Sequence, residues 1–301
     1  MKYFTTSDEP LRLDAGTRRE LRGSFIELSD GVTHYELTGP EDGEIAVLIG
    51  GLMIPLSYWD AAAVELHARG MRTLAFSCYG RGYSDRVQAR YDETLFARQL
   101  SDLVERLDLT RPLHVVGTSM GALIAMAYAE KHAASIATLD IIGPAGLLPS
   151  TKKSPDRMLR SDLVAGFVAR RRGRQLLEEH LGHNIDDPKL SADLAAIVLD
   201  AYQYEGSLYA FFDTLQHLPF SGRTEVFRRT GELGLPTLLL WGADDKVTPA
   251  VNMDTARGLL HAQESHLLQD CGHMVPFERP RDVAEKIAAF ASLHATERLE
   301  P

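Results

Sequence analysis

The sequence predicts an α/β fold, in which a mostly parallel, eight-stranded sheet is flanked by helices and a helical segment is inserted late in the chain. Short apolar runs alternate with segments of helical period along most of the sequence, which is typical of a parallel sheet buried on both faces. The first two runs instead alternate polar and apolar residues around Asp30 and Gly31, a dipeptide suited to a tight hairpin. The sheet is therefore expected to begin antiparallel and to continue parallel.

The predicted strands and helices follow one another in a regular order. The strands fall within residues 25–39 (two strands), 45–51, 71–77, 112–117, 135–143, 235–242 and 264–270. The helices fall at residues 58–69, 94–109, 120–132, 249–260 and 281–294. Residues 149–234 show several helical periods and no credible strand. We therefore predict one core domain, residues 1–148 and 235–301, interrupted by a helical cap at residues 149–234.

The net charge of the protein indicates which macromolecules it is not expected to bind. Lys and Arg number 32 against 42 Asp and Glu, for a formal net charge of −10, which repels phosphate backbones and anionic lipids. We therefore expect no nucleic acid and no membrane as partner. The N-terminal residues lack the apolar core of a signal peptide, and the two cysteines, Cys78 and Cys271, form no disulfide framework. These features predict a cytoplasmic protein with reduced thiols.

Neither a cofactor nor a metal is expected. Gly80-Arg81-Gly82 lacks the third glycine of a dinucleotide-binding loop, and no phosphate-binding loop of the Gly-Lys-Ser/Thr type occurs. The histidines are scattered and match no zinc-binding spacing. We interpret the glycine-rich turn around Arg81 as structural.

Ser119 stands at the centre of a Gly-X-Ser-X-Gly run, Gly117 to Gly121, where a predicted strand meets a predicted helix. Such a turn is so sharp that the residues beside the serine must be small, and the serine hydroxyl projects above the sheet. The alternative is a serine that only caps the helix. The strand and helix on either side favour a nucleophile.

A nucleophilic serine requires a histidine to accept its proton and an acid to orient that histidine. Asp244 and Asp245 follow one later apolar strand, and His273 follows the next. The order serine, acid, histidine, with each residue on a loop after a strand, is that of one hydrolase arrangement.

These motifs resemble those of the α/β-hydrolase superfamily, and specifically a cap-bearing, esterase-like serine hydrolase. The resemblance spans residues 25–294 apart from the cap. It implies that Ser119, Asp245 and His273 form a catalytic triad, because the acid usually stands three residues after a glycine such as Gly242. Asp244 is then a loop or capping carboxylate.

The same resemblance implies where a negative oxygen of the transition state would be bound. The backbone N–H of Met120, directly after the serine, is one expected donor, and the N–H of Leu52 is the other. The family commonly shows His-Gly-X-Pro at this loop, followed by a tryptophan that Trp59 matches. Gly50 and Met53 depart from that pattern.

The expected substrate pocket combines this loop with the cap. We expect Met53 and Trp59, together with the cap residues Tyr202, Tyr209 and Phe212, to contact a substrate of apolar or aromatic bulk. The alternative is that the cap aromatics only pack the cap against the sheet.

Residues 152–174 carry eight basic and two acidic side chains. Against a protein of net negative charge, this segment is a candidate docking face for an acidic carrier protein that delivers an acyl chain. The alternative is a solvated helical face.

Together these features predict a hydrolase that cleaves a carboxylic ester, thioester or lactone through an acyl-enzyme. Hydrolysis of a carbon–carbon bond in a diketone-type substrate is an alternative, because a triad by itself does not distinguish these reactions. A ligand-binding protein of the same fold without catalysis is a third possibility.

Overall fold

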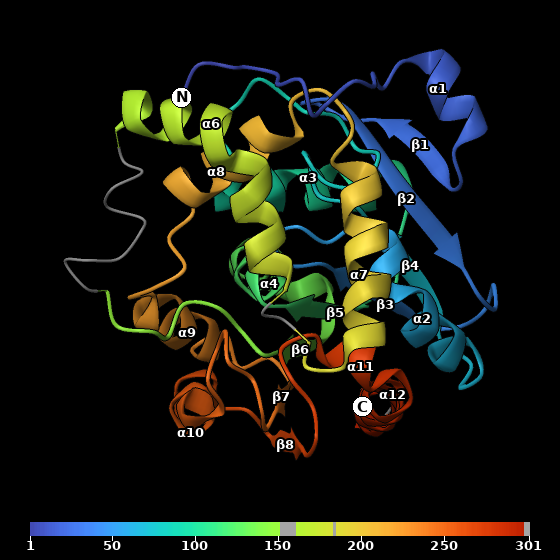
Figure 1. Ribbon diagram of the computed structural model, residues 1–301. Coiled ribbons are helices and arrows are strands. Elements are labelled where there is room, and N and C mark those ends of the chain that lie inside the picture. Colours follow the sequence, from blue (N-terminus) through green and yellow to red (C-terminus); the bar gives the residue numbers. More distant parts are fainter. Residues whose placement is uncertain (151–160, 183–184, 298–301) are drawn as a thin grey trace.

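The computed structural model describes residues 1–150, 161–182 and 185–297, with side chains described up to His294. Within these residues eight strands form one sheet, in the order β1-β2-β4-β3-β5-β6-β7-β8 (Figure 1). The strands are β1 (Ser24–Glu27), β2 (Val32–Thr38), β3 (Ile45–Ile49), β4 (Arg72–Phe76), β5 (Leu113–Thr118), β6 (Ile136–Ile142), β7 (Thr237–Gly242) and β8 (Glu264–Leu268).

The strand directions confirm the predicted sheet. β1 pairs with β2 and β2 with β4 in antiparallel register, whereas β3, β4, β5, β6, β7 and β8 pair in parallel. Ile49, the last residue of β3, lies beside Gly117 near the end of β5. The loops that follow the two strands therefore emerge at the same edge of the sheet, which is where ligands of open α/β sheets bind.

Helices cover both faces of the sheet. α2 (Asp60–His67) and α12 (Pro280–Glu297) pack on each other, α2 also contacts β4, and α12 contacts β6 and β7. α3 (Glu93–Arg106), α4 (Met120–His132), α9 (Thr224–Gly231) and α10 (Met253–Leu260) form a second group through α3–α4, α4–α9 and α9–α10 contacts. Because the central strands β3, β5, β6 and β7 are covered on both sides, every one of their residues is buried.

Helices α6 (Asp162–Leu181), α7 (Pro188–Ala201) and α8 (Ser207–His217) lie between β6 and β7 in the chain, within the range predicted for the cap. α6 contacts both α7 and α8, and Figure 1 shows α6 and α7 in front of the sheet. α9 belongs to the same range of residues but packs on the core helices α4 and α10.

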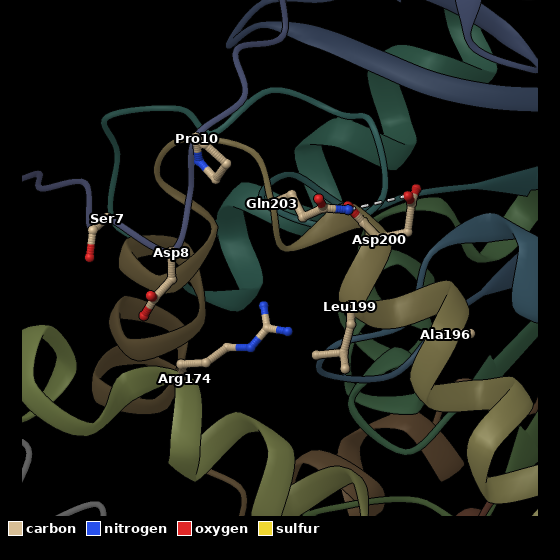
Figure 2. Close-up of a pocket in the computed structure, with 8 residues that line it drawn as sticks. All are labelled: Ser7, Asp8, Pro10, Arg174, Ala196, Leu199, Asp200 and Gln203. Carbon is tan, nitrogen blue, oxygen red and sulfur yellow. Dashed lines mark hydrogen bonds between the residues drawn. The ribbon is translucent and has the colours of Figure 1, made fainter.

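The N-terminal residues form an arm along α7 and α8; helices α6–α8 are called the cap below. Leu11 exchanges backbone hydrogen bonds with Gln203 and Glu205, and the buried carboxylate of Glu9 accepts from the N–H of Leu208 at the start of α8. The arm forms a groove of about 610 Å³ with α6 and α7. Figure 2 shows Arg174 projecting into this groove. The arm was not foreseen from the sequence, because its short polar segments have no clear period.

Of the helices that the structure describes, none combines the length and the apolar character needed to cross a membrane.

Candidate active site

Ser119 occupies a strained turn between β5 and α4. Its φ of 54° and ψ of −116° lie in a region that residues with a side chain seldom adopt. A Cβ on Gly117 would lie 2.4 Å from the carbonyl oxygen of Gly121, and a Cβ on Gly121 would lie 2.2 Å from that of Ile49. Both flanking positions therefore require glycine. The Ser119 side chain makes no capping hydrogen bond with α4, so the capping alternative does not describe this turn.

The hydroxyl of Ser119 faces His273. The Oγ atom lies 3.1 Å from His273 Nε2, and His273 Nδ1 lies 2.8 Å from Asp245 Oδ2. Three residues far apart in the sequence thus form one hydrogen-bonded chain, in which Nδ1–H donates to the carboxylate and leaves Nε2 as the base beside the hydroxyl.

Asp245, rather than its neighbour, reaches the histidine. Its second oxygen, Oδ1, accepts hydrogen bonds from the backbone N–H groups of Val247 and Thr248 at 2.9 and 2.7 Å. The hydroxyl of Thr248 donates to Oδ2 at 2.7 Å. Asp244 is exposed. These hydrogen bonds hold the carboxylate of Asp245 in one orientation.

A second carboxylate orders the loop that carries His273. Glu278 accepts from the backbone N–H of Gly272 at 2.9 Å and from that of Met274 at 3.0 Å. Burial raises the pKa of Glu278. Through these two hydrogen bonds, Glu278 fixes the backbone on both sides of His273.

The loop after β3 lies beside Ser119. A Cβ added at Gly51 would lie 3.4 Å from Ser119 Cβ, and the loop is closed by a hydrogen bond from Ile54 N–H to the Gly51 carbonyl. Gly50, where the family commonly has histidine, would bring a Cβ to within 3.0 Å of the Ile54 side chain. The loop is therefore packed tightly against Ile54, which explains this departure. The two expected N–H donors, those of Leu52 and Met120, belong to this loop and to the first residue of α4.

A cavity of about 350 Å³ opens at Ser119 and His273. Leu52 and Met53 line it on the side of the loop after β3, and of these two Met53 is a predicted pocket residue. The remaining wall is mostly apolar and comes from the cap and from loops, namely Gly51, Ile54, Thr118, Ala145, Leu148, His180, Leu215, Phe220, Val247, Thr248 and Met274. An apolar pocket with few polar groups at one end is the usual form of a small-molecule site.

Four predicted pocket residues are not among those that line this cavity. Trp59 is buried at 1% exposure and packs edge-on against Tyr58. Tyr209 packs against Tyr91 and donates to the carbonyl of Ala89.

The other two are cap aromatics. Tyr202 and Phe212 both pack against Phe211. The prediction that these four residues line the substrate pocket is therefore corrected, because their rings are buried among other aromatic side chains, including Tyr58 of η1 (Leu56–Trp59).

The structure describes residues 161–174 of the basic segment predicted at residues 152–174. Residues 152–160 lie outside the described residues. Arg170, Arg171 and Arg172 on α6 are exposed, with the guanidinium of Arg170 over the ring of Phe4 and that of Arg171 over the ring of Phe167. Arg174 donates to Glu178 on the same helix.

In the part of the chain that the structure describes, no group of three His, Cys, Asp or Glu side chains could hold a metal ion. Cys78 and Cys271 are buried free thiols, and burial raises the pKa of each to about 12. Neither thiol is activated as a nucleophile.

Comparison with known proteins identifies the family. A family model described as "Alpha/beta hydrolase family" matches residues 46–286. The chain is 28% identical, over 92% of its own length and 96% of the relative, to a 2-hydroxy-6-oxononadienedioate/2-hydroxy-6-oxononatrienedioate hydrolase of Cupriavidus pinatubonensis. It is also similar to monoacylglycerol lipase abhd6-B of Xenopus laevis, at 25% identity, but this match covers 66% of the chain and only 61% of that relative.

Solved structures give the same fold. An esterase from Thermogutta terrifontis superposes with a TM-score of 0.76 at 23% identity, over 91% of this chain and 99% of that one. An enol-lactonase from Burkholderia xenovorans superposes with a TM-score of 0.73 at 17% identity, over 89% of this chain and all of that one. With the eight-stranded sheet and a family match over most of the sequence, the chain belongs to the α/β-hydrolase family.

Proposed function

We propose that this α/β hydrolase cleaves an uncharged, largely apolar carboxylic ester through an acyl-enzyme on Ser119. The observation that carries the proposal is the hydrogen-bonded chain Ser119–His273–Asp245, at 3.1 and 2.8 Å, at the end of an apolar cavity.

The reaction follows from the positions of these atoms. His273 Nε2 takes the proton of the Ser119 hydroxyl while Oγ attacks the ester carbonyl carbon. The resulting oxyanion accepts hydrogen bonds from the N–H groups of Leu52 and Met120. Collapse of this intermediate breaks the bond to the alcohol oxygen, which receives the proton from Nε2. A water molecule then attacks the acyl-enzyme by the same route and releases the acid.

The lining of the cavity supports an uncharged substrate. Apart from His273 and His180, no basic side chain is found among the described residues that line it. Burying a carboxylate among apolar side chains without a cationic partner is costly. A volume of about 350 Å³ suits an acyl group of short to medium length.

Carbon–carbon bond hydrolysis is a second candidate, favoured by one observation. The Cupriavidus relative, whose name describes dioate substrates, matches almost the whole chain. Such substrates carry two carboxylates, and the scarcity of basic side chains in the described lining favours the ester over them. Loss of the ultraviolet absorbance of a dienol dioate in the presence of the protein would support the second candidate instead.

An acyl thioester on an acidic carrier is a variant of the ester proposal. The exposed Arg170, Arg171 and Arg172 support it by providing three adjacent cations on α6. If carrier docking uses them, activity on an acyl-carrier substrate falls steeply as salt concentration rises, whereas activity on a small ester does not.

The deciding experiment combines labelling and turnover. The protein is treated with a fluorophosphonate probe and assayed on para-nitrophenyl esters of increasing acyl length, beside Ser119→Ala and His273→Ala variants. Mass addition at Ser119, with turnover lost in both variants that still fold, is the expected result. A folded wild-type protein that neither labels nor turns over any ester would overturn the proposal and favour a ligand-binding role.

A further inference from the structure

Arg81 is a fully buried cation next to the proposed site. It has 0% exposure and lies in the turn after β4, between Gly80 and Gly82. A Cβ on Gly80 would lie 2.3 Å from the Cβ of Ala210 on the cap helix α8. The turn that holds Arg81 therefore touches the cap directly, and glycine is needed at position 80 to allow this approach.

The guanidinium of Arg81 joins three parts of the chain. Its Nε donates to the carbonyl of Leu52 at 2.7 Å, its Nη1 to the carbonyl of Tyr79 at 3.0 Å, and its Nη2 to Oγ1 of Thr214 on α8 at 2.8 Å. The Thr214 hydroxyl donates its own proton to the carbonyl of Ala210, so it faces Arg81 as an acceptor. Each nitrogen of the guanidinium has a neutral oxygen partner.

This arrangement differs from an ordinary buried ion pair. None of the described Asp or Glu carboxylates forms a salt bridge with Arg81. The ring of Phe96 lies 5.3 Å from the guanidinium carbon and that of Tyr91 lies 5.9 Å from it. Burial of a charge without a counterion is unfavourable, and a planar guanidinium is the side chain that can orient three separate acceptors at once.

We infer that Arg81 is the positioning residue of the oxyanion hole. It holds the Leu52–Met53 peptide by the Leu52 carbonyl and thereby restrains the adjoining Gly51–Leu52 peptide, which carries the Leu52 N–H. It also joins that backbone to the cap through Thr214. This inference rests on the proposed function, since Leu52 N–H is one of its two oxyanion donors.

The cap contact gives this link a second consequence. Leu215, the residue after Thr214, lines the cavity. A substrate that fills the cavity therefore contacts the same turn of α8 that orients Arg81. Arg81 therefore links two features of the site, which are the position of the Leu52 N–H and the filling of the acyl pocket by substrate.

The test separates positioning from folding. Arg81→Lys keeps the charge but replaces three nitrogens spread over a planar fork with one ammonium nitrogen, which cannot reach all three acceptors at their present positions. We expect kcat to fall roughly tenfold to a hundredfold with KM little changed, since a displacement of about 1 Å in a reacting geometry costs on the order of a hundredfold.

Arg86→Lys is the matched control. Arg86 also joins the core to the cap, through Ser207 and the carbonyls of Ser84 and Ala201, but it makes no contact with the loop after β3 in these hydrogen bonds. Its loss should lower the melting temperature as much as that of Arg81 and leave kcat near the wild-type value.

Inhibition gives a readout that a purely structural role would not change. A trifluoromethyl ketone forms a hemiketal with Ser119 whose oxyanion requires the hole, whereas the matching methyl ketone reports ordinary binding. Arg81→Lys should raise the inhibition constant of the fluoroketone at least tenfold and leave that of the methyl ketone within about twofold. Thr214→Val should give a smaller change in the same direction, and Thr214→Ser should restore the wild-type value.

Failure of the positioning role and failure of the proposed function give different results. An unchanged ratio of the two inhibition constants in a folded Arg81→Lys protein would overturn the positioning role while leaving the ester hydrolase intact. Absence of fluoroketone inhibition and of ester turnover in the wild type would instead count against the proposed function itself.

Discussion

The hydroxyl of Thr248 and the imidazole of His273 share one carboxylate oxygen. Both lie against Oδ2 of Asp245, at 2.7 and 2.8 Å, while Oδ1 is occupied by two backbone N–H groups. The orientation of the acid therefore depends on Thr248, which was not recognised as a site residue from the sequence.

Thr248→Val should lower kcat roughly tenfold on the best ester substrate, because Oδ2 loses a hydrogen bond of about 1 kcal/mol and the carboxylate gains freedom to turn from the imidazole. Steady-state kinetics measure the effect. Thr248→Ser, which keeps the hydroxyl, is the control, and equal losses in the two variants would contradict this role.

Asp245→Asn should reduce kcat by about 10⁴-fold, because the amide favours the wrong tautomer of His273 and does not stabilise the imidazolium. The matched change is Asp244→Asn, on the exposed neighbour, which should leave kcat unchanged. A larger loss in the second variant than in the first would show that the register of the acid is wrong.

Gly121→Ala should lower the free energy of unfolding by about 3 kcal/mol, since its Cβ would meet the backbone oxygen of Ile49 at 2.2 Å and the main chain of β3 or α4 would have to shift. Gly258→Ala in α10 is the control, because no atom lies within 4 Å of its Cβ and alanine is the better helix former. Urea denaturation of the two variants compares them, and comparable stability would refute the steric argument.

Phe220→Ala should move the preferred acyl chain to a longer one. Phe220 forms part of the cavity wall, and removal of its ring leaves room for several methylene groups, each of which contributes about 0.8 kcal/mol when buried. The ratio kcat/KM across a series of para-nitrophenyl esters measures this shift. Phe211→Ala, at a buried residue that is not among those lining the cavity, should lower stability without lengthening the preferred chain.

Asp140→Asn should make stability less dependent on pH. Burial raises the pKa of Asp140 in β6 to about 8, and one carboxyl oxygen has no hydrogen-bond partner among the described residues. Between about pH 4 and pH 8 the folded protein keeps a proton that the unfolded chain releases, so stability falls as pH rises, by at most about 1.4 kcal/mol per unit.

Asparagine at position 140 does not titrate, so the variant lacks this pH-dependent contribution to the free energy of unfolding. Unfolding free energies of wild type and Asp140→Asn should be similar near pH 4, and the difference should grow in favour of the variant up to pH 8. A difference that stays constant over this range would contradict the raised pKa.

Much of the fold followed from local patterns. The apolar runs that became β3, β5, β6 and β7 are recognisable because these strands are buried on both faces, and a fully buried strand has a continuous apolar sequence. The turn at Ser119 was recognisable for a related reason, since a Cβ at Gly117 or Gly121 would strike backbone atoms.

The cavity wall depended on how the cap packs. Tyr202, Tyr209 and Phe212 are aromatic residues of the kind found in substrate pockets, yet they are buried away from the cavity, whereas Leu148, Leu215 and Phe220 line it. The sequence does not show whether an apolar side chain faces the core or a ligand, because this depends on how each helix is rotated about its own axis.

The sequence by itself determined the order of the strands along the chain, the family and the residues proposed as the triad, because each leaves a local mark in spacing, glycine content or period. Tertiary structure alone decided which side chains enclose the cavity and that Arg81 donates a hydrogen bond to the Leu52 carbonyl. These are contacts between residues tens to hundreds of positions apart, and such contacts depend on how the elements pack rather than on any short stretch of sequence.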